Sequence, residues 1–244
     1  MKDNLKDLIQ HVQLEGVDLI KVLGTDKETK VAAVAEDKSV IVYGTFKNPI
    51  ADFIGTFGMP NLGKLKTILG IDEYRENAKI TVNTQVDTEG KRVPSGIHFE
   101  NAAGDFKNDY RYMDANVIND KLKTVKFKGV AWGVDFVPTV AGIQRLRMQA
   151  AANSEETTFT AKTENGDLKF YFGDHSTHAG NFVFQSDVGG SITGKNFSWP
   201  VKEFIGIMDL VGDKTIRVSD AGATEIVVDS GIATYRYLLP ANVK

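Results

Sequence analysis

One run of glycines has the spacing of a phosphate-binding loop. Gly189, Gly194 and Lys195 match the pattern GxxxxGK, in which backbone N–H groups and the lysine surround a phosphate. Such a loop also needs a Ser or Thr directly after the lysine to bind Mg²⁺, and a helix that begins at this point. Asn196 takes that position, and residues 197–199 separate it from the next helical pattern. We therefore favour a glycine-rich hairpin turn and keep a nucleotide-binding protein that uses residues 189–195 as an alternative.

Two histidines stand close together in one segment. Asp174, His175 and His178 offer a carboxylate and two imidazoles, which are ligands of zinc or iron. A stable site needs a third or fourth strong ligand, and the sequence places no partner for His11 or His98 near this segment. The chain has no Cys, which excludes disulfides, thiol nucleophiles and cysteine zinc sites. We therefore expect no metal and no cofactor.

No set of residues has the spacing of a catalytic site. A Ser-His-Asp triad, a pair of catalytic carboxylates and a cofactor-binding fingerprint cannot be assigned from the order of the residues. We therefore expect a protein without catalytic residues that is not an enzyme.

The composition narrows the classes of protein further. The chain has 244 residues, 42% of them hydrophobic and 25% charged, as in ordinary folded proteins. Its 29 Lys and Arg against 32 Asp and Glu give a formal net charge of −3, which excludes a surface that binds nucleic acid all over but allows a local basic patch. The first residues lack the apolar segment of a signal peptide, and no 18 apolar residues run together. We expect a soluble, cytoplasmic protein with no membrane partner.

Four segments show apolar residues at the 3,4 spacing of an amphipathic helix. The first covers roughly residues 4–14. The second opens at Asn61, a good N-cap, and stops at Gly70. The third starts at Thr139, and the fourth opens with Pro200, which suits the first position of a helix, and ends near Gly212.

Most other segments alternate in polarity or are rich in β-branched residues, as strands are. The expected strands are 31–34, 40–43, 79–82, 157–161, 168–172, 181–184, 215–218 and 225–228, with turn signals at 89–90 and 165–166. Because the helices are too few for one helix per strand, a parallel sheet is not expected. The predicted fold class is α+β with antiparallel sheets.

The sequence contains an internal repeat. YRYMDANV at 110–117 returns as YRYLLPANV at 235–243, an offset of 125 residues, and IQHVQ at 9–13 is echoed by IQRLR at 143–147. The order helix, strands, helix, strands therefore occurs twice and predicts two similar domains with two helices each. We expect a first domain at 1–117, a lysine-rich connector at 118–128 and a second domain at 129–244.

All four predicted helices carry Lys or Arg away from their apolar faces, although the protein is acidic overall. These residues are Lys2, Lys6, Lys64, Lys66, Arg145, Arg147 and Lys202. Gathered on one surface, they would contact phosphates without reading bases, whereas scattered exposed lysines are commonplace. Glu203 and Asp209 weaken the pattern in the fourth helix.

With these features the chain resembles a sliding clamp of DNA replication, the processivity-factor family of phages, archaea and eukaryotes. The resemblance rests on the duplicated order of elements, the charged connector and the C-terminal segments GDKTIRVSD at 212–220, IVVDSG at 226–231 and YRYLLPA at 235–241. The chain length suits the phage type, in which case the protein would act in the cytoplasm of a bacterial host. The resemblance implies a homotrimeric ring around double-stranded DNA that tethers the DNA polymerase and is opened by a clamp loader.

The resemblance also implies roles for particular residues. The seven basic residues would line the hole of the ring and bind DNA. A partner pocket would contain Ile118, Leu122, Tyr237, Leu239 and Pro240. Edge strands at 107–112 of one chain and 180–184 of the next would join at the subunit interface, with Tyr110, Tyr112, Asn181 and Val183 as candidates. A β-rich structural protein of a virion is the remaining alternative.

Overall fold

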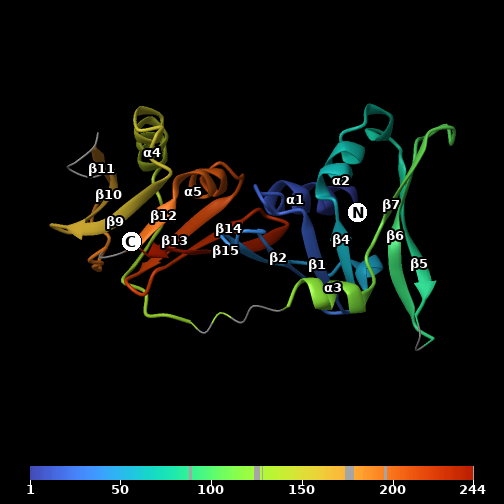
Figure 1. Cartoon of the computed structure of the whole chain (residues 1–244). Helices are drawn as coiled ribbons and strands as arrows, with labels where there is room; N and C mark the ends of the chain where they lie inside the picture. The colour runs from blue at the N-terminus through green and yellow to red at the C-terminus, as the bar shows by residue number, and fades with distance from the viewer. Residues whose placement is uncertain (88–89, 124–126, 128, 174–178, 195–196, 244) are drawn as a thin grey trace. The chain divides into compact units, whose positions relative to one another are not determined.

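The chain forms two compact units (Figure 1). The computed structural model describes residues 1–87, 90–123, 127, 129–173, 179–194 and 197–243. The first unit consists of Met1–Asp37, Val42–Lys126 and Ser230–Tyr235, and the second of Lys38–Ile41, Phe127–Asp229 and Arg236–Lys244. The domain boundaries expected from the sequence stay a prediction.

The N-terminal part of the first unit opens with the helix α1 and closes with the short helix α3. Its elements are α1 (Lys2–Val12), β1 (Leu19–Gly24), β2 (Thr29–Val34), β3 (Ile41–Phe46), η1 (Ala51–Phe53), β4 (Gly55–Pro60), α2 (Leu62–Leu69), η2 (Asp72–Tyr74), β5 (Lys79–Val86), β6 (Arg92–Glu100), β7 (Lys107–Arg111) and α3 (Ala115–Lys121).

The second unit repeats most of this order. Its elements are β8 (Val134–Phe136), α4 (Val140–Ala152), β9 (Thr158–Glu164), β10 (Asp167–Phe172), β11 (Gly180–Gln185), β12 (Phe197–Pro200), α5 (Val201–Met208), β13 (Asp213–Ser219), β14 (Ala223–Asp229) and β16 (Asn242–Val243). The remaining strand, β15 (Ala233–Pro240), begins in the first unit and ends in the second.

The sheet topology shows the duplication that the sequence repeat predicted. In the first unit four antiparallel strands have the order β4-β1-β2-β3, and in the second the order is β12-β9-β10-β11. Each sheet thus places the fourth strand beside the first, and a helix follows the fourth strand in both units. Three further strands follow that helix, β5-β6-β7 in one unit and β13-β14-β15 in the other. The predicted α+β class with antiparallel sheets is confirmed.

The four predicted helices are present, and α5 ends at Met208 rather than near Gly212 as expected. The Asn61 side chain accepts a hydrogen bond from Lys64 N as the N-cap of α2, which ends before Gly70, and Thr139 caps α4 through a bond from Gly142 N. Pro200 precedes α5 as its N-cap residue rather than taking the first helical position. Within each unit the two helices pack against each other, α1 on α2 and α4 on α5 (Figure 1).

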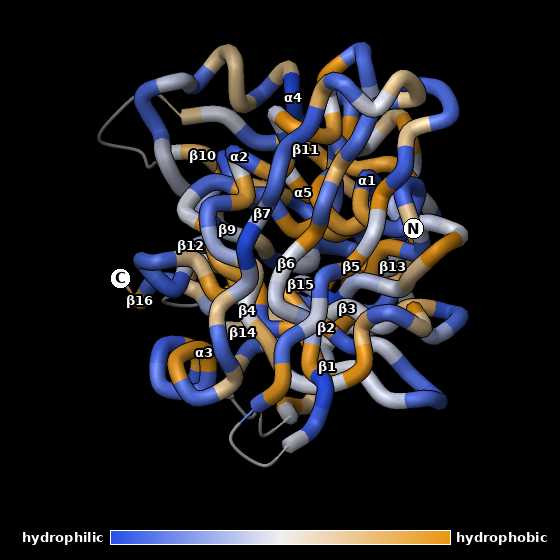
Figure 2. The backbone as a smooth tube through the Cα atoms, turned by 90° about the vertical axis from the view of Figure 1, so that its right-hand side faces the viewer, coloured by the Kyte–Doolittle hydropathy of each residue, from blue (hydrophilic) through white to orange (hydrophobic). Residues whose placement is uncertain are grey.

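A fifth helix, α3, was not predicted and occupies the start of the expected connector. It carries both hydrophobic and hydrophilic residues within its turns (Figure 2). Its Ile118 is fully buried against β4, where a Cβ on Gly58 would lie only 2.9 Å from Ile118 Cδ1. Gly58 also exchanges two backbone hydrogen bonds of 2.8 Å with Met113, the residue that leads into α3. A residue without a side chain at position 58 therefore lets α3 lie directly on the sheet.

A polar network joins α1 to the start of β15 inside the first unit. The buried Asp7 carboxylate accepts hydrogen bonds from Tyr235 Oη at 2.8 Å and Ser230 Oγ at 3.0 Å. One turn later on α1, His11 stacks on the Tyr235 ring with 4.7 Å between the ring centroids. Because Tyr235 is fully buried and the Asp7 side chain is only 9% exposed, the Tyr235 hydroxyl depends on this acceptor inside the protein.

Removing the Tyr235 hydroxyl should measurably weaken this network. We expect Tyr235→Phe to lower the free energy of unfolding by about 1.5 kcal/mol, because the Asp7 carboxylate loses a buried donor. Tyr112→Phe is the matched control, since the buried Tyr112 hydroxyl has no hydrogen-bond partner among the described residues and its loss should cost nothing. Urea unfolding of the two variants checks the difference, and equal effects would contradict the role given to Asp7.

Candidate nucleic-acid interface

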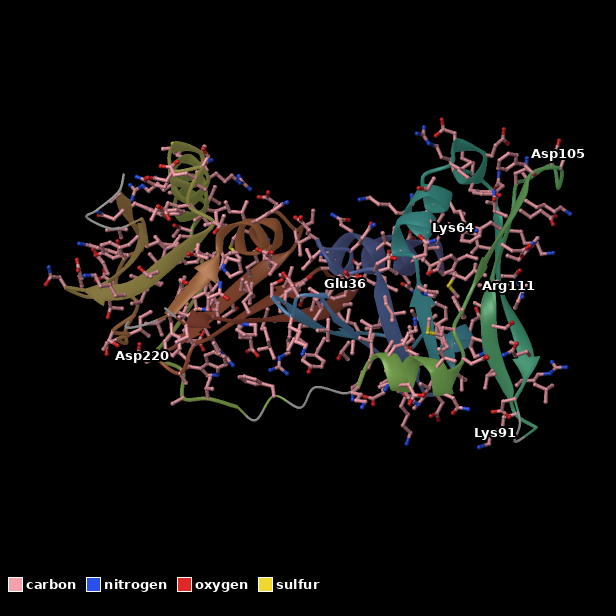
Figure 3. The ribbon with its side chains drawn as sticks, viewed as in Figure 1. Glu36, Lys64, Lys91, Asp105, Arg111 and Asp220 are labelled. Carbon is pink, nitrogen blue, oxygen red and sulfur yellow. The ribbon has the colours of Figure 1, made fainter. Side chains whose placement is uncertain are left out.

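The helix pair of the first unit presents lysines beside a buried apolar face. In α1 the side chains of Leu5, Leu8, Ile9 and Val12 are buried, and Lys6 is exposed. In α2, Lys64 and Lys66 are exposed on either side of the buried Leu65, and Figure 3 shows Lys64 on this helix. The lysines thus flank the apolar face, as the helical period of 3.6 residues requires.

Lys2 differs from the other lysines of this pair because its ammonium group is engaged. Lys2 Nζ donates hydrogen bonds to the backbone oxygens of Tyr74 and Arg75, the latter at 2.8 Å. It therefore ties the first turn of α1 to the segment that follows α2. A phosphate would have to compete with these two carbonyl groups for Lys2.

The helix pair of the second unit presents fewer accessible cations. In α4, Arg145 and Arg147 are exposed on either side of the fully buried Leu146. Arg147 Nε donates to Asp209 Oδ1 at 3.0 Å, and its Nη2 donates to the same oxygen. In α5 the basic residue is Lys202, which is exposed.

Six of the seven basic residues fall into two groups, and Lys202 is assigned to neither. Lys6, Lys64, Lys66 and Arg145 make no ion pair within the residues that the structure describes, so their charges are open to a ligand. Lys2 and Arg147 already have acceptors within the chain. That all seven contact DNA stays a prediction.

The residues predicted for a partner pocket are mostly packed inside the protein. Ile118, Tyr237 and Leu239 are fully buried, Leu122 is half-buried and Pro240 is exposed. Ile118 and Leu122 belong to the first unit, and the other three belong to the second. The connector residues 124–126 and 128 lie outside the described residues. The pocket stays a prediction.

The strands predicted for the subunit interface both lie at sheet edges. β7 pairs with β6 alone in the order β5-β6-β7, and β11 pairs with β10 alone in its sheet. Two hydrogen bonds, from Tyr112 N to Ser95 O and from Asn101 N to Phe106 O, show which residues of β7 bond to β6. In an antiparallel pair every second residue does so, and the residues between them point the other way. The backbone groups of Tyr110 and Tyr112 therefore point to β6, and those of Lys107, Asp109 and Arg111 point away from the sheet.

The same reasoning applies to β11. Asn165 and Gly166 both have positive φ and form the two-residue turn between β9 and β10, which makes Glu164 and Asp167 a hydrogen-bonded pair. Along β10, residues that bond to β9 alternate with residues that bond to β11, and Asn181 and Val183 stand opposite residues that bond to β9. The backbone groups of Asn181 and Val183 therefore point away from the sheet. One of these groups, Asn181 O, lies 3.5 Å from Gln149 Nε2. Sequence reasoning named the strand 107–112 and singled out Tyr110 and Tyr112 on it, whereas the outward backbone groups of β7 belong to the alternate residues of the same strand.

The glycine-rich segment at 189–194 does not form a phosphate cradle. Thr193 N donates to Asp220 Oδ1 at 2.8 Å, Gly194 N donates to the same carboxylate at 3.3 Å, and Ser191 N donates to Gly133 O at 3.0 Å. These N–H groups are therefore satisfied by protein acceptors, one of them a carboxylate, which repels phosphate. Lys195 and Asn196 lie outside the described residues.

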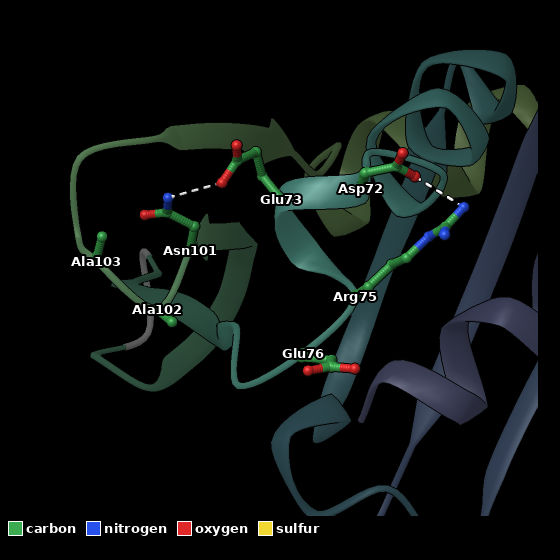
Figure 4. Close-up of a pocket in the computed structure, with 7 residues that line it drawn as sticks. All are labelled: Asp72, Glu73, Arg75, Glu76, Asn101, Ala102 and Ala103. Atoms are coloured by element: carbon green, nitrogen blue, oxygen red, sulfur yellow. Dashed lines mark hydrogen bonds and ion pairs between the residues drawn. The ribbon is translucent and has the colours of Figure 1, made fainter.

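Two further candidate sites concern a metal ion and a small molecule. Residues 174–178, which include both clustered histidines, lie outside the described residues, and within the described residues no group of three or more His, Asp or Glu could hold a metal ion. A hollow of about 480 Å³ at the end of α2 is lined by Asp72, Glu73, Arg75, Glu76, Asn101, Ala102 and Ala103 (Figure 4). Its carboxylates are partly committed, because Glu73 accepts from Asn101 and Asp72 pairs with Arg75.

No described helix has both the length and the apolar character needed to cross a bilayer.

The segment of residues 191–194 should depend on Asp220 for its stability and should not bind nucleotides. We expect Asp220→Ala to lower the free energy of unfolding by about 1 kcal/mol, because two N–H groups and the Thr193 hydroxyl lose their acceptor. Asp26→Ala, which removes an exposed carboxylate from the turn after β1, is the control and should have no effect. Addition of Mg²⁺–ATP to the unaltered protein should leave its melting temperature unchanged, and a shift of several degrees would contradict this reading.

Similarity to known proteins is confined to the level of structure. No protein-family model matches the sequence, and no curated protein matches it. The PCNA of A. fulgidus, solved with the C-terminal region of FEN-1 bound to it, is similar with a TM-score of 0.65 and 16% identity over 100% of this chain and 96% of that chain. The PCNA of Thermococcus kodakaraensis is similar with a TM-score of 0.67 and 11% identity over 99% and 97%. The chain therefore has the fold of the PCNA sliding clamps.

Proposed function

We propose that the protein is a sliding clamp, a closed ring of three chains that encircles double-stranded DNA. In this role it tethers the replicative DNA polymerase, gives it processivity, and is placed on DNA by a clamp loader. The observation that carries the proposal is a pair of edge strands, β7 and β11, that are copies of two strands already paired within the chain.

The strands that correspond to β7 and β11 are paired with each other within the first unit. There the start of β15 lies beside β3: Lys47 N donates to Ile232 O at 3.0 Å, and a Cβ on Gly44 would lie 2.9 Å from the Tyr235 ring. The residue numbers rise along one strand as they fall along the other, so the strands are antiparallel. In the duplicated order of elements, β7 is the copy of β15 and β11 is the copy of β3.

The duplication also supports a register for pairing between chains. Tyr110 is the copy of the β15 tyrosine that lies beside Gly44. Gly44 lies against Val31 on β2, and Phe182 pairs with Phe170 on β10. Val31 and Phe170 hold the same position in the two sheets, so Phe182 is the copy of Gly44. Tyr110 of one chain would therefore stand opposite Phe182 of the next.

One chain uses β7 where the next uses β11, so the contact joins two different surfaces. Such a heterologous contact closes into a ring or continues as a filament, depending on the rotation between neighbours. The resemblance to sliding clamps favours closure with three chains, and Tyr110, Tyr112, Asn181 and Val183 remain the proposed interface residues. Closure also covers both edges, which otherwise invite open-ended aggregation.

A disulfide should trap this register. In the proposed pairing Asp109 stands opposite Val183, with Cα atoms about 5.5 Å apart, within the range of a disulfide. Because the chain has no Cys, Asp109→Cys with Val183→Cys introduces the sole thiols. Mild oxidation should give a covalent trimer on a denaturing gel.

The control for this experiment is Asp109→Cys with Asp26→Cys, in which the second thiol lies on the exposed turn after β1. This pair should give no covalent trimer. Cross-linking of the control but not of the designed pair would overturn the proposed register.

The basic helices support DNA as the ligand of the ring. Phosphate contacts by lysine and arginine give affinity without sequence preference, which lets a ring slide because no base contact must break. The proposed contacts are Lys2, Lys6, Lys64, Lys66, Arg145, Arg147 and Lys202, of which Lys6, Lys64, Lys66 and Arg145 have uncommitted charges within the described part of the chain. The net charge of −3 fits a field that is positive only near these helices.

Removal of two of these lysines should weaken DNA binding in a salt-dependent way. We expect Lys64→Ala with Lys66→Ala to reduce the slope of log K against log salt by about 0.9 for each lost phosphate contact. Lys27→Ala with Lys79→Ala removes the same charge from exposed positions outside the helices and should leave the slope unchanged. Fluorescence anisotropy with a labelled duplex measures both, and identical slopes would favour the alternative of a structural protein of a virion.

The polymerase and the loader are the proposed protein partners, and the resemblance to sliding clamps supplies the residues proposed to bind them. Ile118, Leu122, Tyr237, Leu239 and Pro240 are its proposed residues. A nucleotide-binding function has little support, because the N–H groups of Ser191, Thr193 and Gly194 already have acceptors. The phage type, and with it the cytoplasm of a bacterial host, is kept as part of the proposal on the resemblance alone.

A further inference from the structure

One of the seven basic residues is neutralised by a carboxylate on the neighbouring helix end. Arg147 lies on the side of α4 that meets α5, and Asp209 is the residue that follows the last turn of α5. Both guanidinium nitrogens that contact Asp209 use the same oxygen, Oδ1. Both side chains are 50% exposed, so a ligand in solution can reach the pair.

The first unit shows that the fold does not need this ion pair. The sequence repeat aligns Gln13 with Arg147, although Gln13 follows the last turn of α1 and Arg147 lies within α4; α1 itself contains no arginine. The residue that follows α2 is Gly70, with φ −85° and ψ −8°, and Asp209 after α5 has φ −81° and ψ −12°. These positions are thus equivalent in backbone geometry, and the first copy packs its two helices with neither partner of the pair.

A second cation, Lys214, and a second carboxylate, Asp213, lie near the pair. Lys214, on β13, donates to Leu210 O and to Gly212 O in the loop that follows α5, the latter at 3.0 Å. Burial lowers the pKa of Lys214, while the Asp209 charge acts to raise it and the Arg147 charge to lower it. Asp209 therefore stands within electrostatic reach of two cations.

We propose that Asp209 is an intramolecular competitor of DNA phosphate for Arg147 and so limits the affinity of the second unit for DNA. This inference rests on the proposed function. A phosphate can bind the Nε–Nη2 side of the guanidinium as the Asp209 carboxylate does, so DNA and Asp209 compete for this side of Arg147 and for its charge. Because Asp209 belongs to the same chain as Arg147, it competes whenever DNA approaches, and no second protein is required.

Limited affinity suits a ring that must move along DNA. A contact that is exchanged between an internal carboxylate and successive phosphates holds the chain less firmly than a free arginine. The first unit has no equivalent carboxylate, since Gly70 stands in its place. The two helix pairs of one chain thus differ in how strongly they bind the same ligand.

The test is a double-mutant cycle of Asp209→Asn and Arg147→Ala in the full chain. We expect Asp209→Asn to bind a labelled duplex about three- to tenfold more tightly and to steepen the salt slope by about 0.9, because one more phosphate contact is made. Arg147→Ala alone should weaken binding less than about twofold, whereas in the Asp209→Asn background it should abolish most of the gain. Equal effects of Arg147→Ala in both backgrounds would overturn the inference.

Asp26→Asn is the matched control, since it removes one negative charge from an exposed turn of the first unit. The same variants are eluted from heparin, a polyanion, with a salt gradient. A later elution of Asp209→Asn than of Asp26→Asn, lost on adding Arg147→Ala, supports the competition even if no variant binds duplex DNA. That combination would reject the proposed function alone, whereas identical elution of the two Asp→Asn variants would reject the role of Asp209.

Discussion

Backbone N–H and C=O groups at a sheet edge must find partners in water, in another segment or in another chain, and this constraint governs the assembly proposed here. Along β7 the outward groups belong to Lys107, Asp109 and Arg111, and Arg111 is visible on this strand in Figure 3. Along β11 they belong to Asn181 and Val183. The equivalent strands β15 and β3 satisfy the same need inside the chain. The duplication thus provides one closed pairing and one open pairing of the same kind.

The strand β15 contributes neighbouring residues to the two units. Tyr235 donates to the buried Asp7 of α1 in the first unit, and Arg236 Nε donates at 3.1 Å to the buried Glu225 of β14 in the second. Both acceptors are carboxylates shielded from water, where loss of one partner is costly. Since α1 carries Lys6, the position of a proposed DNA contact depends on a strand more than 220 residues away in sequence.

Local signals predicted the helices and the fold class, but not the partners of individual side chains. Asn61, Gly70 and Thr139 act through their own backbone neighbourhood, so the ends of α2 and α4 could be located from the sequence. The short helix α3 escaped because one buried residue, Ile118, gives no helical period, and its place depends on a glycine 60 positions away. Likewise, pairing of Arg147 with Asp209 and of Asp220 with the 193–194 backbone arises only when separate elements meet. The topology of β7 and β11 as edges was expected only through the resemblance to sliding clamps.

The solution mass of the protein, measured by light scattering across a wide range of concentrations, tests ring closure most directly. A ring of three chains of 26.8 kDa predicts a single species of about 80 kDa whose mass stops growing as concentration rises. A mass of 26.8 kDa at every concentration would contradict the account, because β7 and β11 would then remain unpaired between chains. A mass that increases without limit would contradict it as well, since the same heterologous contact would then build a filament instead of a ring.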